Sequence, residues 1–362
     1  MRKTFAMISL LLGGCSLQAQ EKIMLLVGTY TGNGSKGIYS FTFDQATGKA
    51  EALDSLAMRN PSFLTLSTDG RTAYVVSETA DEQASLNIVD VKSNGSMRLL
   101  TTTPTAGADP CFVATNGRIA VTANYSGGSM STFRLSADGR QASLATRFLG
   151  NIGGPDASRQ AAPHVHCACF TPDGRYVLAT DFSADRILSF SLRGQTVVAN
   201  GTATRVSPDS GPRHLEFSND GRFAYLMSEL SGRVTAFRYS DGRLQQIQEI
   251  VSDSAGARGG ADVHISPDGR FLYSSNRLRD EGIAIFAVDT SSGLLTRIAY
   301  QPTGAHPRQF SITPNGRFLL CCCRDSDKIQ VFSRDARTGL LTDTHQDIHV
   351  RQAVCAAFAA PR

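Results

Sequence analysis

The chain has no tryptophan, no run of lysine or arginine and little charge of either sign. Of its 362 residues, 19% are charged, and the formal net charge of +4 falls to +2 when Arg2 and Lys3 are set aside. A nucleic-acid-binding surface needs concentrated positive charge, so we expect no nucleic-acid partner. Past residue 21 no apolar run approaches the roughly 18 residues that a membrane helix requires, which excludes an integral membrane segment there.

The first 20 residues have the pattern of a secretory signal peptide. Arg2 and Lys3 precede an apolar stretch from Phe5 to Leu12, and small residues follow. Two processing routes are open. Leu12-Gly13-Gly14-Cys15 is similar to a bacterial lipobox, which would give Cys15 a lipid anchor, whereas Leu17-Gln18-Ala19 offers an ordinary cleavage site. We expect an exported protein, either periplasmic or a membrane-anchored lipoprotein.

The eight cysteines do not have the spacing of a disulfide framework or a zinc site. Cys167 and Cys169 alternate along one segment, three more are consecutive from Cys321, and no Cys-x2-Cys pair occurs. Chains with a large apolar core do not need disulfides to fold. We therefore expect small buried apolar cysteines, and we predict no metal and no cofactor.

A repeated hairpin defines the predicted fold. An Asp-Gly-Arg or Asn-Gly-Arg turn between two apolar runs is a strong hairpin signal. It recurs roughly every 47 to 57 residues, with its glycines at Gly70, Gly117, Gly174, Gly221, Gly269 and Gly316.

A second hairpin follows each turn and occurs seven times, from residues 37–41 to residues 328–332. The first hairpin is complete only six times. Its seventh copy is split, with 354–358 matching the inner strand and 23–27 supplying the next strand. Pairing of the two termini would remove the exposed edges of an open array. We predict an all-β fold, a seven-bladed β-propeller closed by its N- and C-terminal strands, as one domain over residues 21–362. A closed propeller has no obligatory partner surface, so we expect a monomer.

Polar residues are concentrated where the first strand of a blade begins and the second ends. Both places lie at one rim of a propeller, so these side chains are expected to converge on one mouth of the central channel. Five histidines precede or begin first strands, and two arginines share the register of His166: His164, His166, His214, His264, His306, Arg213 and Arg308. The second strands are expected to end at Glu78, Asn124, Asp181, Glu229, Asn276, Arg277 and Arg324.

Several of these segments resemble the propeller-type 6-phosphogluconolactonases, a family that includes the fungal carboxymuconate-lactonizing enzyme. The matching motifs are Pro163-His164-Val165-His166, Gly211-Pro212-Arg213-His214, Ser228-Glu229-Leu230, Ala261-Asp262-Val263-His264 and Ser275-Asn276-Arg277. The resemblance implies metal-independent hydrolysis of a sugar lactone, 6-phosphogluconolactone or a related aldonolactone. Two features depart from the family: Met227-Ser228 stands where Val-Asn is common, and the chain carries an export signal.

The resemblance implies a catalytic site of His164 or His166, Arg213, Glu229 and Arg277. Our hypothesis assigns the base to His166, or to Glu229 with a pKa lifted by partial burial. Arg213 would then face the reacting carbonyl and Arg277 a distal anionic group. The remaining rim residues are expected to bind substrate, namely His214, His264, Asn276, Arg308 and Asp181. Two alternatives are a non-catalytic envelope propeller that binds a ligand or protein, and a muconate-type cycloisomerase.

Overall fold

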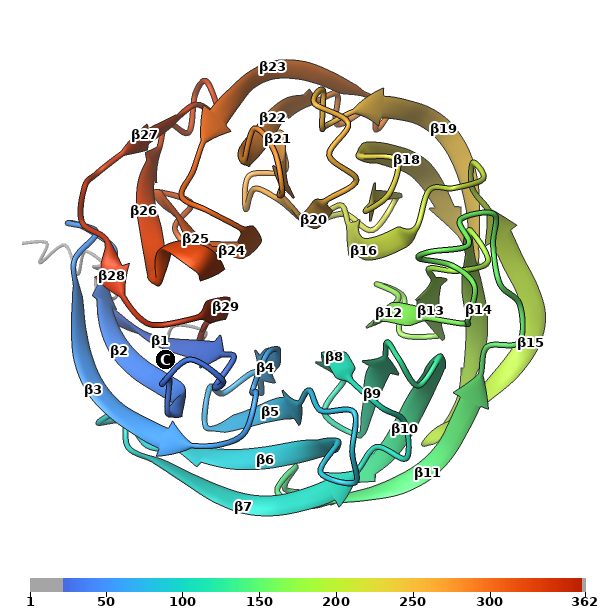
Figure 1. The fold of residues 1–362 in the computed structure, drawn as a ribbon, viewed down its shortest axis with the longest axis horizontal. Helices are drawn as coiled ribbons and strands as arrows, with labels where there is room; N and C mark the ends of the chain where they lie inside the picture. The colour runs from blue at the N-terminus through green and yellow to red at the C-terminus, as the bar shows by residue number, and fades with distance from the viewer. Residues whose placement is uncertain (1–21, 360–362) are drawn as a thin grey trace, which may run out of the picture.

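Seven antiparallel sheets surround a central channel in the computed structural model, which describes residues 22–359 (Figure 1). The predicted signal peptide and Cys15 lie outside the described residues. The helical structure of the described part is one short 3-10 helix, η1 (Arg324–Ser326). No helix within residues 22–359 is long and apolar enough to cross a membrane. The prediction of a seven-bladed, all-β propeller is confirmed.

Each blade consists of four strands, ordered from the channel outward. Blade 1 contains β29 (Ala353–Phe358), β1 (Lys22–Thr29), β2 (Gly37–Asp44) and β3 (Ala50–Ala57). Blade 2 contains β4 (Leu64–Leu66), β5 (Thr72–Ser77), β6 (Ser85–Val91) and β7 (Met97–Pro104). Blade 3 contains β8 (Pro110–Thr115), β9 (Ile119–Asn124), β10 (Ser129–Leu135) and β11 (Ala142–Leu149). Blade 4 contains β12 (Val165–Phe170), β13 (Tyr176–Asp181), β14 (Arg186–Arg193) and β15 (Thr196–Arg205).

The remaining blades repeat this order. Blade 5 contains β16 (Pro212–Phe217), β17 (Phe223–Ser228), β18 (Arg233–Ser240) and β19 (Arg243–Val251). Blade 6 contains β20 (Gly260–Ile265), β21 (Phe271–Asn276), β22 (Gly282–Val288) and β23 (Leu295–Pro302). Blade 7 contains β24 (Pro307–Ile312), β25 (Phe318–Cys323), β26 (Lys328–Arg334) and β27 (Leu341–Asp343), and β28 (Ile348–His349) also pairs with β26.

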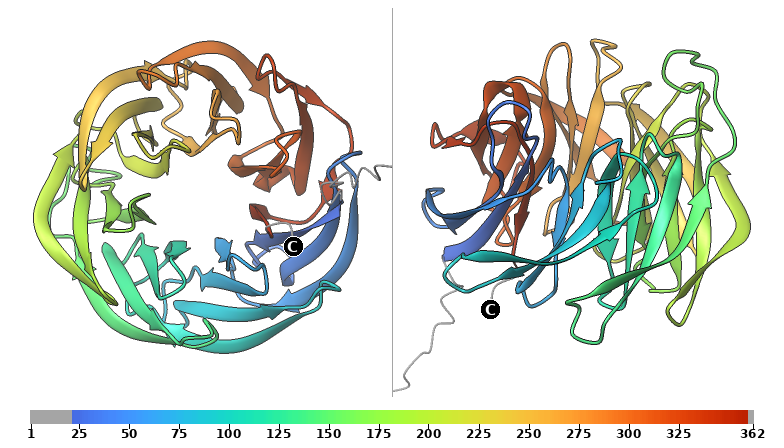
Figure 2. Two further views of the ribbon diagram at one scale, coloured as in Figure 1. Left: turned by 180° about the vertical axis from the view of Figure 1, so that it is seen from behind. Right: turned by 60° about the horizontal axis from the view of Figure 1, so that its bottom comes forward.

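The ring is closed by pairing between the two ends of the described chain, as the split hairpin predicted. β29 is the innermost strand of blade 1 and runs antiparallel to β1, with Leu25 opposite Phe358 and Val27 opposite Ala356. Both views of the ribbon place the blue N-terminal strands beside the red C-terminal strand (Figures 1 and 2). Closure pairs the inner edge of β1 with β29, so the N-terminal strand is not left as an open edge of the ring.

Apolar side chains between neighbouring blades form the core. The second strands are buried along nearly their whole length, whereas the outermost strands alternate between covered and exposed residues. Phe43 of blade 1 is fully buried at the closing joint. Its ring lies 5.7 Å from that of Phe318 in blade 7 and 5.6 Å from that of Phe358 in β29.

One backbone hydrogen bond occurs at the same place in all seven blades and shapes the mouth of the channel. The N–H of the residue after the second strand donates to the carbonyl of a residue just before the inner strand, at 2.8–3.1 Å. The seven donors, which we call the mouth ring, are Tyr30, Glu78, Tyr125, Phe182, Glu229, Arg277 and Arg324. The bond holds both strand ends at one rim, as the sequence analysis expected.

A β-bulge lies directly beside this hydrogen bond in six inner strands. The pairing passes from Val165 to Cys167, for example, and leaves His166 unpaired. Arg213 and Arg308 are unpaired in the same way. A bulge re-aims the side chain of the extra residue, so three of the predicted site residues owe their direction to this feature.

We predict that Phe43→Ala will reduce the free energy of unfolding by about 3–5 kcal/mol, because it leaves a cavity at the joint that closes the ring. Denaturant unfolding followed by circular dichroism measures this. The control is Leu99→Ala on the outer strand β7, where the side chain is 42% exposed and the expected change is within about 0.5 kcal/mol. Equal losses in both variants would contradict the role given to this aromatic contact.

Candidate active site

A carboxylate held by three arginines lies at one side of the mouth. Glu229 follows β17 in the mouth ring, and its Oε2 lies 2.9 Å from Arg213 Nε and 3.0 Å from Arg277 Nη2. Its Oε1 accepts a hydrogen bond from Arg159 Nη2 at 2.6 Å. Three guanidinium groups share one carboxylate, so the cluster keeps an excess of positive charge.

The arginines lower the pKa of Glu229 to about 2. Burial of the carboxyl acts in the opposite direction, but the charges of Arg277, Arg213 and Arg159 outweigh it. The expectation that burial would lift this pKa is therefore wrong, because it did not count the arginines. Glu229 is ionised at neutral pH and has little tendency to take up a proton, so it is a weak general base.

Two of the three arginines are fixed by the backbone as well as by Glu229. Arg277 donates from Nε to the carbonyl of Gly259 at 2.9 Å and from Nη2 to that of Gly260 at 3.2 Å. Arg213 Nη1 donates to the carbonyl of Ala261. Burial lowers the pKa of Arg277 to about 9 even though Glu229 opposes the shift, so Arg277 is still protonated at neutral pH.

The histidine pair comes from the start of β12, and its two members differ in surroundings. His164 Nδ1 lies 2.9 Å from the carbonyl oxygen of Tyr125, and its ring stacks on the Tyr125 ring at 4.2 Å. A carbonyl can only accept, so Nδ1 carries the proton and the neutral ring has its free lone pair on Nε2. His166 is buried, with Nδ1 3.8 Å from Cys111 Sγ. Burial and then Arg213 lower the pKa of His166 well below its ordinary value.

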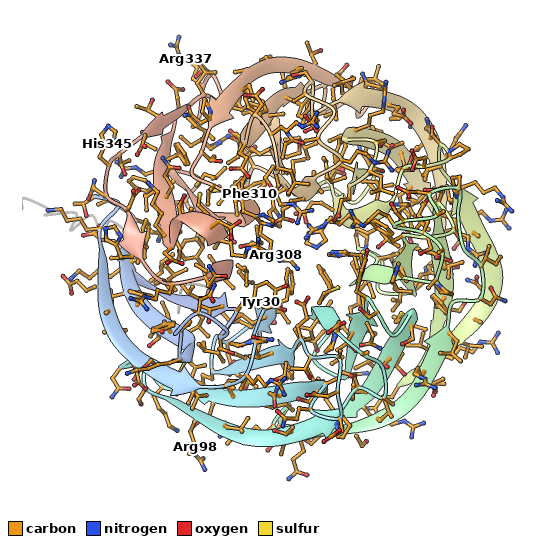
Figure 3. All side chains as sticks on the ribbon, in the orientation of Figure 1. Tyr30, Arg98, Arg308, Phe310, Arg337 and His345 are labelled. Atoms are coloured by element: carbon orange, nitrogen blue, oxygen red, sulfur yellow. The ribbon has the colours of Figure 1, made fainter. Side chains whose placement is uncertain are left out.

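A second polar cluster faces the channel from blades 7, 1 and 2. The Tyr30 hydroxyl donates to Glu78, 2.9 Å from both carboxylate oxygens. Arg308 lies over the Tyr30 ring at 5.3 Å, with Nη2 3.8 Å from Glu78 Oε1. Figure 3 shows Arg308 and Tyr30 pointing into the channel, whereas Arg98 and Arg337 project from the outer surface.

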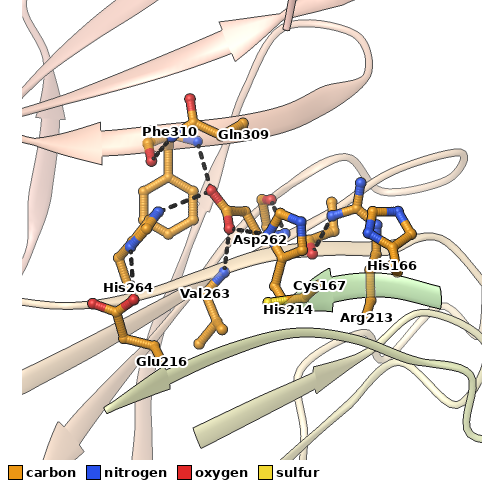
Figure 4. Close-up of polar contacts among 12 residues, drawn as sticks. His166, Cys167, Arg213, His214, Glu216, Asp262, Val263, His264, Gln309 and Phe310 are labelled. Atoms are coloured by element: carbon orange, nitrogen blue, oxygen red, sulfur yellow. Dashed lines mark hydrogen bonds and ion pairs between the residues drawn. The ribbon is translucent and has the colours of Figure 1, made fainter. Parts of the chain in front are cut away.

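His214 and His264 share one buried aspartate further along the inner strands. His214 Nδ1 donates to Asp262 Oδ1 at 2.6 Å and His264 Nε2 to Oδ2 at 3.0 Å (Figure 4). The backbone N–H of Phe310 also donates to Oδ2, at 3.2 Å. Asp262 thus joins inner strands of blades 5, 6 and 7, and the two histidines lower its pKa against the effect of burial.

Two of the predicted substrate-binding residues point away from the mouth. Asp181 pairs with Arg186 at 2.8 Å, and Asn276 exchanges hydrogen bonds with Ser252. Both are the last residues of their strands and are fully buried. Side chains alternate along a strand, so the residue one position later, such as Arg277, faces the mouth.

Glu78 was predicted at the mouth without a role, and Arg159, Tyr30 and Tyr125 were not predicted as site residues. Tyr30 and Tyr125 occupy the register of Glu229 in their own blades. Extending the count from Gly117 by one residue would have found Tyr125, whereas Tyr30 lies in the split blade, which has no turn glycine to count from. Arg159 lies in a connection outside the repeat, and nothing in the repeat pattern indicates its position.

The fold and this site define a propeller hydrolase in which arginine, histidine and carboxylate groups converge at one mouth. Within residues 22–359 no group of three or more His, Cys, Asp or Glu is arranged to hold a metal ion. Residues 24–358 match the family model described as "Lactonase, 7-bladed beta-propeller". The chain belongs to this lactonase family and is a lactone-hydrolysing enzyme.

Three relatives are similar over nearly their whole length. The 6-phosphogluconolactonase of Bacillus subtilis is 33% identical over 343 residues, which cover 92% of this chain and 97% of the relative. A solved structure from Bacteroides uniformis, assigned as a 6-phosphogluconolactonase, has a TM-score of 0.92 and 56% identity, and the match covers 94% of this chain and 100% of that one. The periplasmic gluconolactonase of Pseudomonas aeruginosa has a TM-score of 0.87 and 34% identity, with the same coverages.

We predict that Glu229→Gln will lower the free energy of unfolding by about 3 kcal/mol near neutral pH, because a pKa held near 2 stabilises the folded state. Because the pKa of Glu229 is lower in the folded state than in the unfolded state, this stabilisation is fully present above about pH 4.5 and is lost as the pH falls toward 2. Denaturant unfolding of both proteins from pH 7 to pH 3 should show the difference shrinking at acid pH. A difference that is the same at every pH would contradict the ion-pair account.

Proposed function

We propose that the enzyme hydrolyses a six-membered sugar lactone by direct attack of water. The main support for this proposal is the excess positive charge around Glu229, together with His164, whose tautomer is fixed. Ring opening develops negative charge on the carbonyl oxygen and ends in a carboxylate, and fixed cations stabilise both. The names of the relatives, 6-phosphogluconolactonase and gluconolactonase, support an aldonolactone substrate.

The general base in this proposal is His164. Its Nδ1 proton is held by the Tyr125 carbonyl, which leaves Nε2 as the acceptor. His164 is partly exposed, whereas His166 is buried. The pKa of His166 is lowered, so His166 binds a proton less readily than an ordinary histidine. Glu229, with its pKa near 2, instead keeps the arginines in place.

The reaction then proceeds in two steps. His164 Nε2 takes a proton from water as the water oxygen bonds to the carbonyl carbon, and the resulting oxyanion is stabilised by Arg213. Among the described residues Arg213 Nη2 has no hydrogen-bond acceptor, since Nη1 donates to Ala261 and Nε faces Glu229. The oxyanion collapses, the ring C–O bond breaks, and the leaving oxygen receives the proton from His164, which yields the hydroxy acid.

We predict that His164→Asn will lower kcat about 10²- to 10⁴-fold with little change in KM. The asparagine amide can still donate to the Tyr125 carbonyl, but the variant lacks the Nε2 lone pair. Acid release in a pH-stat with δ-gluconolactone and δ-6-phosphogluconolactone measures the rate, with spontaneous hydrolysis as the baseline. Arg213→Ala should lower kcat about 10²- to 10³-fold.

The matched control is His166→Asn, for which we expect less than a tenfold change in kcat. If His166→Asn abolished turnover while His164→Asn retained it, the base would be His166 instead. If the wild-type protein accelerated neither lactone, a sugar lactone would be the wrong substrate class.

We also propose that the enzyme acts outside the cytoplasm. The signal-peptide pattern of residues 1–20 supports this, as does the similarity to a gluconolactonase described as periplasmic. We predict that the exported protein lacks these residues, which mass spectrometry of the intact protein would show. Labelling with radioactive palmitate, compared with Cys15→Ala, tests the lipid anchor; an uncleaved N-terminus would contradict export by this route.

A further inference from the structure

The connection between blades 3 and 4 is longer than its counterparts. It spans residues 150–164, whereas the equivalent connections span residues 105–109, 206–211 and 303–306. This extension accounts for the longest interval between the repeated turns, from Gly117 to Gly174. The fold does not require it, because the other blades close with shorter connections.

Hydrogen bonds of a buried glutamine give the extension a defined shape. Gln160 Nε2 donates to the carbonyl of Phe182 at 2.9 Å and to Asp185 Oδ1 at 3.0 Å. Its Oε1 accepts from the backbone N–H of Asp156 at 3.1 Å. The Ser183 hydroxyl adds a bond to the carbonyl of Ala162. Blade 4 thus holds the extension against the mouth ring at Phe182.

An ion-pair bridge ties the extension to two neighbouring connections. Arg258 Nη2 lies 2.6 Å from Asp156 Oδ2 and 2.7 Å from Asp209 Oδ1. Asp209 belongs to the connection before blade 5 and Arg258 to the one before blade 6. The extension is therefore tied to blade 4 and to the connections before blades 5 and 6, and these contacts brace it.

The brace positions Arg159, the third arginine on Glu229. Its side chain is 38% exposed, whereas those of Arg213 and Arg277 are 2% and 6% exposed. Nη2 contacts Glu229 and lies 3.4 Å from the Tyr125 hydroxyl. Nε and Nη1 have no acceptor among residues 22–359, so Arg159 keeps donors available to a ligand.

Resting on the proposed lactone hydrolysis, we infer that Arg159 determines substrate specificity by binding an anionic substituent of the lactone, a phosphate or a carboxylate. An arginine presents paired donors to either group. We prefer this assignment to the sequence-based hypothesis that Arg277 reads the distal anion. Glu229 and two backbone carbonyls hold Nε and Nη2 of Arg277, and its Nη1 lies 3.4 Å from His306 Nε2.

The test compares Arg159→Gln with the wild type on three lactones: neutral δ-gluconolactone, δ-6-phosphogluconolactone and a glucarolactone that carries a carboxylate. We expect KM for the anionic substrates to rise about tenfold to a hundredfold, and KM for the neutral lactone to change less than threefold. Arg159→Lys should recover part of the loss. Arg337→Gln on the outer surface is the matched control, and thermal melts confirm that each variant folds.

The two anionic lactones separate phosphate from carboxylate recognition. An equal change in KM for all three lactones would overturn the assignment while leaving lactone hydrolysis intact. Calorimetry with 6-phosphogluconate, glucarate and gluconate gives a reading independent of turnover. If the wild type hydrolysed no lactone, but Arg159→Gln bound 6-phosphogluconate or glucarate more weakly while gluconate binding was unchanged, the anion site would stand and the proposed reaction would fail. Binding that is unchanged in the variant would also overturn the assignment.

Discussion

The backbone hydrogen bond between the two strand ends of each blade is the constraint on which the mouth depends. Because it recurs in all seven blades, it places seven side chains in one ring whatever their chemistry. The adjacent bulge then leaves at least one further residue of the inner strand unpaired in six blades, which re-aims its side chain. The scaffold thus fixes positions, and the residue types at those positions determine the chemistry.

Charge is distributed unevenly over this symmetric frame. Glu229 collects three arginines on one side of the channel, and Glu78 faces Tyr30 and Arg308 on another. A buried ion is costly unless its partners and hydrogen bonds are complete. The backbone carbonyls of Gly259 and Gly260 meet this requirement for Arg277. The carboxylate therefore serves the site mainly by keeping guanidinium groups buried and aligned.

The fold could be predicted from the sequence because the repeat is local. Turn glycines and alternating apolar runs show each hairpin, and the split copy at the two ends shows the closure. The direction of single side chains was less predictable, because it alternates from one residue to the next and the exact end of each second strand decides which residue faces the mouth. Asn276 and Arg277 are neighbours in sequence, yet one is bonded inside the blade and the other faces Glu229. The pKa of Glu229 was not predictable without knowing that three arginines surround it.

Arg159 was missed because it lies in the part of the chain that departs from the repeat. That departure was visible as one long interval between turns, although a long interval gives no indication of where its residues lie. The structure shows that the extra residues are braced by Gln160 and by the Asp156–Arg258 pair. Ordering a loop costs conformational entropy, so an extension with this many specific contacts has a defined conformation to maintain. Arginines fixed by backbone carbonyls suit a charge that develops at one point, whereas a partly exposed arginine on a braced extension can meet substituents that differ between substrates. The regular repeat therefore supplies the groups suited to the reaction, and the irregular connection supplies the group suited to substrate choice.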